Sequence, residues 1–187
     1  LTHKSAGVYN EEWQRNRLLF SKIYRNFLPC RLNPEKIIFD PCGIKKFNIG
    51  NSLVSIIIPT KDKIEMVMDC IDSIINHTHI AQYEIAIADT GSTKENKKKL
   101  SGWIKNIGKK PNLKAIKLIE YSYYNFAKIN NDVVKGLPSK SNYILFCNND
   151  IKLLNDAVDR CLSFFKQGKN NIGTVGIRLH YADAMSD

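Results

Sequence analysis

The stretch Tyr143-Ile-Leu-Phe-Cys-Asn-Asn-Asp150 joins an apolar run to an abrupt polar ending. Residues 143–147 favour a strand, and three polar side chains follow them directly. In a chain where strands and helices alternate, this pattern is typical of a buried strand that ends at the carboxyl edge of its sheet. Open α/β sheets bind ligands at that edge. Asp150, flanked by Asn148 and Asn149, therefore suits a hard divalent cation that is shared with phosphate oxygens.

Strands and helices alternate on both sides of this stretch. Further apolar runs predict strands at 53–58 (closed by Pro59), 83–88, 113–119 and 172–179. Apolar residues at helical spacing predict helices over about 64–77, 93–107, 126–135 and 157–167. Short links between alternating elements indicate an α/β fold, with a mostly parallel sheet, right-handed crossovers and flanking helices.

Residues 1–50 differ in composition from the rest of the chain and are predicted to be a helical extension with a connector, ahead of a nucleotide-binding unit over 51–187. The acidic stretch 10–12 is typical of a helix start, and Pro29 should end that helix. The helix either packs on protein or lies, as a basic amphipathic helix, on an anionic membrane. Residues 30–50 are rich in Pro and Gly and form the connector.

The formal net charge of +10 favours acidic partners such as nucleotides, nucleic acid or an anionic membrane. Much of the excess lies in the lysine-rich stretch 94–117, which we interpret as a solvated helix face and loop. Nucleic-acid modules interleave stacking aromatics with basic residues, whereas Trp103 of this stretch lies on the apolar stripe. We therefore expect a nucleotide partner and no nucleic acid.

The five cysteines form no CxxC pair. Cys70, Cys147 and Cys161 fall in helical or strand patterns and are predicted to be small core side chains, which indicates a reducing compartment. Cys30 and Cys42 could pair by their spacing, although the use of the other cysteines disfavours it. No apolar run reaches the roughly 18 residues of a membrane span, and no signal-peptide pattern is present.

Polar residues follow four of the predicted strands at matching ends, in the segments 60–62, 89–92, 122–125 and 148–150. Because parallel strands share an edge, we expect these segments to converge in space. Asp89 could accept hydrogen bonds from a base or a ribose, and Gly91 would let the backbone approach closely. Neither phosphate-cradle motif, GxGxxG or GxxxxGK[ST], is present. Diphosphate charge would then be met by a metal on Asp150, helped by Lys61 or Lys128.

Five segments, taken in order, resemble those of family 2 glycosyltransferases: VSIIIPTKD (54–62), EIAIADTGS (84–92), YNFAKINN (124–131), LFCNND (145–150) and VGIRLHYAD (175–183). The similarity spans about residues 53–185 and is greatest to the branch of bacterial O-antigen, capsule and rhamnan glycosyltransferases. The resemblance implies a GT-A fold, with this chain as its N-terminal, nucleotide-binding half. It also implies a nucleotide-diphosphate sugar donor (UDP- or dTDP-linked), a Mn²⁺ or Mg²⁺ ion and inversion at the anomeric carbon.

The same resemblance assigns roles to individual residues. Thr60 and Asp62 match the loop that contacts the nucleoside, and Asp89 matches the aspartate that reads the base or ribose. Asn125 and Asn131 match the segment that closes over the nucleoside.

The segment Asn148-Asn149-Asp150 matches the family's DxD motif, with Asp150 as the direct metal ligand and the two amides as nucleotide-site residues. Asn148 replaces a carboxylate, so metal binding is expected to depend on the donor's own diphosphate. Lys94 stands where the family often has Asp, which removes one expected nucleoside contact. The general base is expected beyond Asp187, so we expect this chain to be a fragment that holds the donor half of the domain.

The function that the resemblance implies is transfer of a sugar to a glycan or lipid-linked acceptor in surface polysaccharide synthesis. We expect a cytoplasmic location, or a peripheral one at the inner face of the cytoplasmic membrane. A nucleotidyltransferase that makes sugar nucleotides is an alternative, but such enzymes carry a glycine-rich basic loop where this chain has the segment 59–62. A non-catalytic nucleotide- or polyanion-binding module is the other alternative, and its function would lie in the basic surface.

Overall fold

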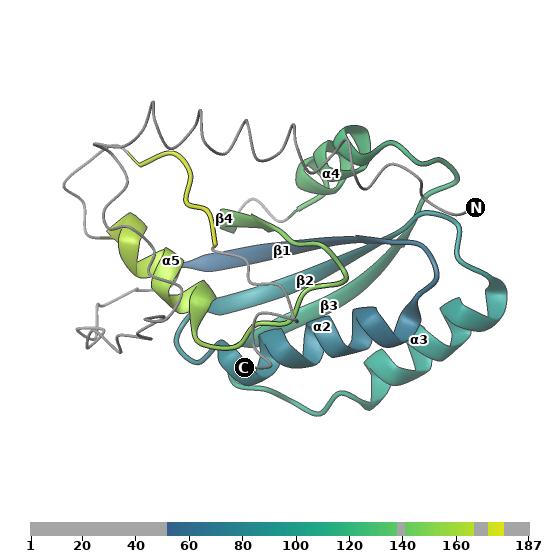
Figure 1. Cartoon of the computed structure of the whole chain (residues 1–187), viewed down its shortest axis with the longest axis horizontal. Coiled ribbons are helices and arrows are strands. Elements are labelled where there is room, and N and C mark those ends of the chain that lie inside the picture. The colour runs from purple at the N-terminus through teal and green to yellow at the C-terminus, as the bar shows by residue number, and fades with distance from the viewer. Residues whose placement is uncertain (1–51, 138–140, 167–171, 178–187) are drawn as a thin grey trace, which may run out of the picture. The chain divides into compact units, whose positions relative to one another are not determined.

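The computed structural model describes residues 52–137, 141–166 and 172–177, which Figure 1 shows in colour. The predicted N-terminal helix, the connector, the domain boundary near residue 50, and Cys30 and Cys42 lie outside the described residues and stay predictions.

Within the described residues, four parallel strands form one sheet in the order β3-β2-β1-β4. These strands are β1 (Leu53–Thr60), β2 (Gln82–Asp89), β3 (Leu113–Glu120) and β4 (Ser141–Phe146). The register puts Thr60 opposite Asp89 and Asp89 opposite Glu120, so the strands end side by side. The predicted α/β class and the predicted convergence of the strand ends are confirmed.

The end of β1 needs a correction, because the strand runs through Pro59 to Thr60 instead of stopping at Pro59. The backbone of Ile57 faces β4, since its carbonyl oxygen accepts from Cys147 N at 2.9 Å. Pro59, two residues later, therefore also presents its backbone nitrogen to the β4 side. Pairing with β4 ends at Ile57, so the proline removes no ladder hydrogen bond.

The second correction concerns the strand that was predicted over residues 172–179. Residues 172–177 form no strand, and the remaining two positions lie outside the described residues. Gly173 and Gly176 interrupt this stretch, and glycine weakens a strand because it is flexible and has no side chain to pack. The segment instead lines a cavity beside β4.

Helices lie where the helical spacing predicted them. They are α2 (Ile64–His77), α3 (Lys94–Asn106), α4 (Phe126–Lys135) and α5 (Ala157–Lys166). Helices α2, α3 and α5 pack on one face of the sheet, and α4 covers the other (Figure 1). Among the described helices, none is both long and apolar enough to cross a membrane.

Side chains alternate along each strand, so successive residues point to opposite faces of the sheet. Ile56 and Ile58 of β1 point into the larger core with α2, while Ile57 points to the α4 side. On β2 the apolar side chains on the α4 side are Ala86 and Ala88, and their small size leaves room for the helix. All five of these side chains are buried, which makes β1 and β2 the centre of the molecule.

A buried carboxylate joins α5 to the turn that follows α2. Asp159 is 1% exposed, and its oxygens accept backbone N–H groups of His79, Ile80 and Ala81 at 2.8, 3.2 and 2.7 Å. Hydrogen bonds to an ionised acceptor are stronger than neutral ones. This contact therefore orients the chain as it enters β2.

We predict that Asp159→Asn lowers the free energy of unfolding by about 3 kcal/mol, because it leaves buried N–H groups facing an amide in place of a carboxylate. Urea denaturation monitored by circular dichroism measures the change. Asp69→Asn is the matched control, since Asp69 makes an exposed ion pair with Lys152 that should contribute under about 1 kcal/mol. Equal losses in the two variants would contradict the role given to Asp159.

Candidate functional site

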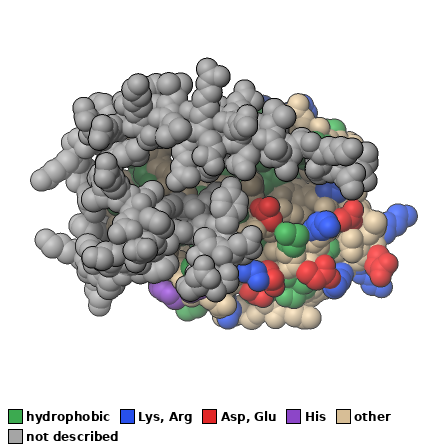
Figure 2. Space-filling model, in the orientation of Figure 1, with side chains coloured by type: hydrophobic (Ala, Val, Ile, Leu, Met, Phe, Trp, Pro, Cys, Tyr) green, Lys and Arg blue, Asp and Glu red, His purple; other side chains and the backbone are tan. Residues whose placement is uncertain are grey.

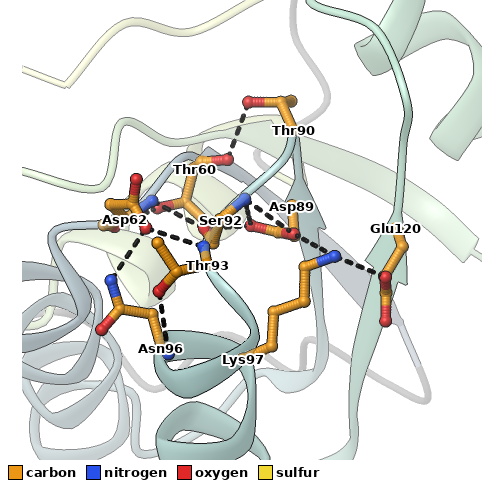
Figure 3. A network of polar contacts seen from close by, with 9 residues as sticks. All are labelled: Thr60, Asp62, Asp89, Thr90, Ser92, Thr93, Asn96, Lys97 and Glu120. Atoms are coloured by element: carbon orange, nitrogen blue, oxygen red, sulfur yellow. Dashed lines mark hydrogen bonds and ion pairs between the residues drawn. The ribbon is translucent and has the colours of Figure 1, made fainter.

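Thr60 ties the ends of three strands together at the carboxyl edge of the sheet. Its Oγ1 accepts from Asn149 Nδ2 at 3.1 Å, just past β4, and donates to the carbonyl of Asp62 at 3.2 Å. Its carbonyl accepts the backbone N–H and the hydroxyl of Thr90, past β2, at 2.8 and 3.0 Å. The structure thus brings together residues that the sequence predicted would converge. Figure 3 shows those that follow β1 and β2.

Asp62 is held at the N-terminus of α3. One of its carboxylate oxygens accepts from Thr93 N at 3.0 Å and from Asn96 Nδ2 at 2.8 Å. These two hydrogen bonds, that from Asn96 first, hold the pKa of Asp62 below its ordinary value. Asp62 and Lys63 both have left-handed backbone conformations, with φ of 52° and 54°, so the chain turns sharply between β1 and α2.

Asp89 is the most deeply placed of the predicted site residues, with 1% of its surface exposed. Its carboxylate accepts from the backbone N–H and the hydroxyl of Ser92. Lys97 Nζ lies 3.5 Å from the same carboxylate and 2.6 Å from Glu120 Oε2. The contact with a base or ribose stays a prediction for this residue.

Ser92 links Asp62 and Asp89, two of the three acidic residues that the family resemblance singled out. Its hydroxyl accepts from Asp62 N at 2.6 Å and donates to Asp89. Gly91, just before it, has a backbone φ of 104°, a conformation that residues other than glycine rarely adopt. A Cβ placed there would meet nothing within 4 Å, so the glycine is required by the backbone turn and not by lack of space.

Sequence reasoning missed Asn96, Lys97 and Glu120 as part of this network. Lys97 belongs to the lysine-rich stretch that we interpreted as solvated. Its position three residues before the buried Leu100 was the available signal, because that spacing places it toward the inner side of α3. The hydrogen bond to Glu120 is the main cause of the raised pKa of Lys97.

The other lysines of α3 fit the interpretation of a solvated face. Lys99 pairs with Glu65 of α2, and Lys94 and Lys98 are exposed. On the face shown in Figure 2, basic and acidic side chains of the described residues are mixed and do not form a region of one sign. Such a surface is typical of a solvated helix face.

The segment after β4 carries the predicted metal ligand. Asn148 and Asp150 are exposed, and Asn149 is half-buried against Thr60. Within the described residues, no group of three His, Cys, Asp or Glu side chains could hold a metal ion unaided. One exposed carboxylate next to two amides fits a hard cation that takes its other oxygen ligands from a bound phosphate.

The segment at the start of α4 has a clear local role. The Oδ1 atom of Asn125 caps the helix by accepting Lys128 N at 2.9 Å. Asn131 lies exposed on the same helix. Lys128 Nζ lies 3.9 Å from the ring centre of Tyr123 and 3.3 Å from Asp132 Oδ2. Lys128 is thus engaged within its own helix region, whereas Lys61 is exposed at the strand ends.

This chain belongs to glycosyl transferase family 2, whose model matches residues 55–184. The match contains the whole described sheet from Ser55 onward and every predicted site residue. The family assignment by resemblance is therefore confirmed.

Two curated relatives illustrate the similarity. An uncharacterized protein, y4gI, of Sinorhizobium fredii is 25% identical over 135 residues, covering 72% of this chain and 14% of that protein. The O-antigen biosynthesis protein RfbC of Myxococcus xanthus is 27% identical over 136 residues, covering 72% of this chain and 10% of that protein. The chain thus spans only a small part of the length of both curated relatives.

A solved mannosyltransferase from Pyrobaculum calidifontis, in complex with GDP-Man and Mn²⁺, superposes with a TM-score of 0.51 at 16% identity. The superposition covers 60% of this chain and 32% of the mannosyltransferase. At this identity the likeness shows the fold alone, which is the GT-A fold that the resemblance implied.

We predict that Asn96→Ala raises the pKa of Asp62 toward its ordinary value of 3.8, because the variant lacks the main hydrogen bond to the ionised carboxylate. Carboxyl carbon shifts followed by NMR as a function of pH measure this pKa. In the wild type, the stabilisation from ionised Asp62 is complete above the unfolded pKa and is lost as pH falls through the lowered folded pKa. The stability difference between wild type and variant should therefore shrink in acid.

Asn106→Ala, at the exposed far end of α3, is the control and should leave the Asp62 titration unchanged. An unchanged pKa in Asn96→Ala as well would show that the side-chain hydrogen bond does not hold Asp62.

Proposed function

We propose that this chain binds the nucleotide-diphosphate sugar donor of a metal-dependent, inverting glycosyltransferase. The observation that carries the proposal is the meeting of Thr60, Asp62, Asp89 and Asn149 at one sheet edge, within a chain of glycosyl transferase family 2. Ligands of open α/β sheets bind at this edge. The solved mannosyltransferase of the same fold holds GDP-Man and Mn²⁺, which supports a nucleotide sugar and a divalent cation here.

The nucleoside would lie over the ends of β1 and β2. Asp62 is partly exposed and fixed by Thr93 and Asn96, so it could accept a hydrogen bond from the nucleoside without losing its own position. Asp89 would act from beneath, through Ser92 or directly on a base or ribose hydroxyl. Asn125 and Asn131, from the opposite side of the sheet, are proposed to close over the nucleoside.

The diphosphate would lie next to the segment 148–150. Asp150 would hold Mn²⁺ or Mg²⁺ together with the phosphates, while Asn148 would contact the nucleotide. A cation there neutralises charge on a departing nucleoside diphosphate. Asn149 donates to Thr60, so it holds the backbone of this segment against the end of β1. Lys61, exposed at the same edge, could add positive charge beside the phosphates.

The wider role proposed for the whole protein is surface polysaccharide synthesis on a glycan or lipid-linked acceptor. The O-antigen biosynthesis protein of Myxococcus xanthus supports this role by its similarity. A UDP- or dTDP-linked donor, a cytoplasmic location and a peripheral contact with the inner face of the membrane are parts of the same proposal. The net charge of +10 would favour an anionic membrane surface.

We predict that Asp150→Ala removes the metal dependence of nucleotide binding. Isothermal titration of the chain with UDP and with dTDP, each with and without Mn²⁺, measures it. In the wild type, Mn²⁺ should strengthen nucleotide binding by tenfold or more, a gain of about 1.4 kcal/mol. In the variant the affinities with and without Mn²⁺ should coincide, because the remaining amides carry no charge.

Asp72→Ala is the matched control, since Asp72 is an exposed carboxylate in the second half of α2, away from the strand ends. It should bind like the wild type. Equal Mn²⁺ enhancement in Asp150→Ala and the wild type would overturn the metal role of Asp150. Failure of the wild type to bind any nucleoside diphosphate would overturn the donor-binding proposal itself.

A further inference from the structure

Two thiols lie directly beneath the segment that carries Asp150. The sulfur of Cys70, on α2, is 3.8 Å from the sulfur of Cys147, which follows β4. Both cysteines are free and buried, with 0% and 5% of their surfaces exposed. They are far apart in sequence, so their contact is a product of the fold.

Both sulfurs also contact the carbonyl oxygen of Asn148. Cys70 Sγ lies 3.5 Å from it and Cys147 Sγ lies 3.4 Å from it. The backbone around them is held on two sides: Cys147 N donates to Ile57 at 2.9 Å, and Ser73 Oγ accepts Leu153 N at 2.9 Å. The short segment between these anchors contains Asn148, Asn149 and Asp150.

One thiol of the pair borders a cavity. Cys147 lines a cavity of about 420 Å³ between β4, α5 and residues 173–177. Cys161 of α5 lines the same cavity but is not part of the pair. Two thiols therefore border this cavity, and Cys147 is the one whose sulfur contacts that of Cys70.

We propose that Cys70 and Cys147 are a site of reversible disulfide formation that displaces the Asn148–Asp150 segment and weakens donor binding. A disulfide has a bond length of about 2.05 Å, so the two sulfurs must approach by less than about 2 Å. Both sulfurs contact the carbonyl oxygen of Asn148 in the reduced chain. Bringing the sulfurs together therefore changes the contacts that hold the segment 148–150. The effect on donor binding rests on the function proposed above, whereas disulfide formation does not.

The oxidant we name is hydrogen peroxide. The sulfur of one cysteine attacks a peroxide oxygen, the O–O bond breaks, and a sulfenic acid and one water form. The second thiol then attacks the sulfenic sulfur, the S–O bond breaks, and the disulfide and a second water form. The two thiols lose two electrons in all, and peroxide gains them. A dithiol reductant reverses the change by thiol–disulfide exchange.

The first experiment detects the bond itself. The chain is treated with hydrogen peroxide, remaining thiols are alkylated, and the digest is analysed by mass spectrometry without reduction. A cross-linked peptide pair containing Cys70 and Cys147 is expected, and it should vanish after dithiothreitol. Cys161→Ser should keep the cross-link, while Cys70→Ser and Cys147→Ser should lose it. Absence of the cross-link in the folded wild type would overturn the proposal.

The second experiment tests the coupling. Titration with UDP and Mn²⁺ should give an affinity about tenfold weaker for the oxidised chain than for the reduced chain, a size typical of coupling between two sites. Peroxide should leave the affinity of Cys147→Ser unchanged and should weaken that of Cys161→Ser as in the wild type. Equal affinities of oxidised and reduced wild type would overturn the coupling.

A third readout is independent of any nucleotide. Hydrogen exchange of the backbone amides over residues 148–150 should be faster in the oxidised than in the reduced chain. If the reduced chain binds no nucleotide, the donor-binding proposal fails. The exchange rates alone then decide whether the disulfide displaces the segment 148–150. Unchanged exchange in a cross-linked chain would show that the disulfide does not act on this segment.

Discussion

The parallel pairing of β1 with β2 on one side and β4 on the other is the constraint on which this structure depends. Because the strands of this sheet are parallel, their carboxyl ends lie at the same edge. The polar residues that follow the strands are therefore placed together at that edge. Thr60, at the end of the central strand, makes this meeting specific through hydrogen bonds to residues past β2 and β4. The sheet therefore builds a site from residues that are up to 89 positions apart.

The acidic residues of the site differ in their burial and in their hydrogen-bond partners. Asp89 is buried and faces Ser92 and Lys97, so its charge is compensated within the chain. Asp62 is partly exposed and takes its hydrogen bonds from the N-terminus of α3, where the unpaired N–H groups of a helix favour a carboxylate. Asp150 is exposed at the other end of the edge. This gradient from buried to exposed fits the proposal that Asp150, the outermost carboxylate, shares its charge with a ligand.

Sequence reasoning was most successful where the signal was periodic. Every described helix and the four strands of the sheet lie where apolar spacing predicted them, because burial on one or both faces imposes that spacing. It was wrong over residues 172–177, where an apolar run broken by Gly173 and Gly176 forms no strand. Sequence reasoning also ended β1 too early, at Pro59. Whether a proline removes a ladder hydrogen bond depends on which neighbouring strand its nitrogen faces, and only the strand pairing shows this.

By itself, the sequence determined the α/β class, the order of the elements and the set of polar residues at the strand ends, since these depend on local pattern along the chain. Only the tertiary structure decided which of those residues touch. The network of Asn96, Lys97 and Glu120 around the predicted aspartates, and the contact of Cys70 with Cys147, join separate elements. Such contacts depend on strand order and helix packing, which no local pattern specifies. In the stretch 143–150, the polar ending is therefore a property of the sequence, and the thiol pair beneath it is a property of the fold.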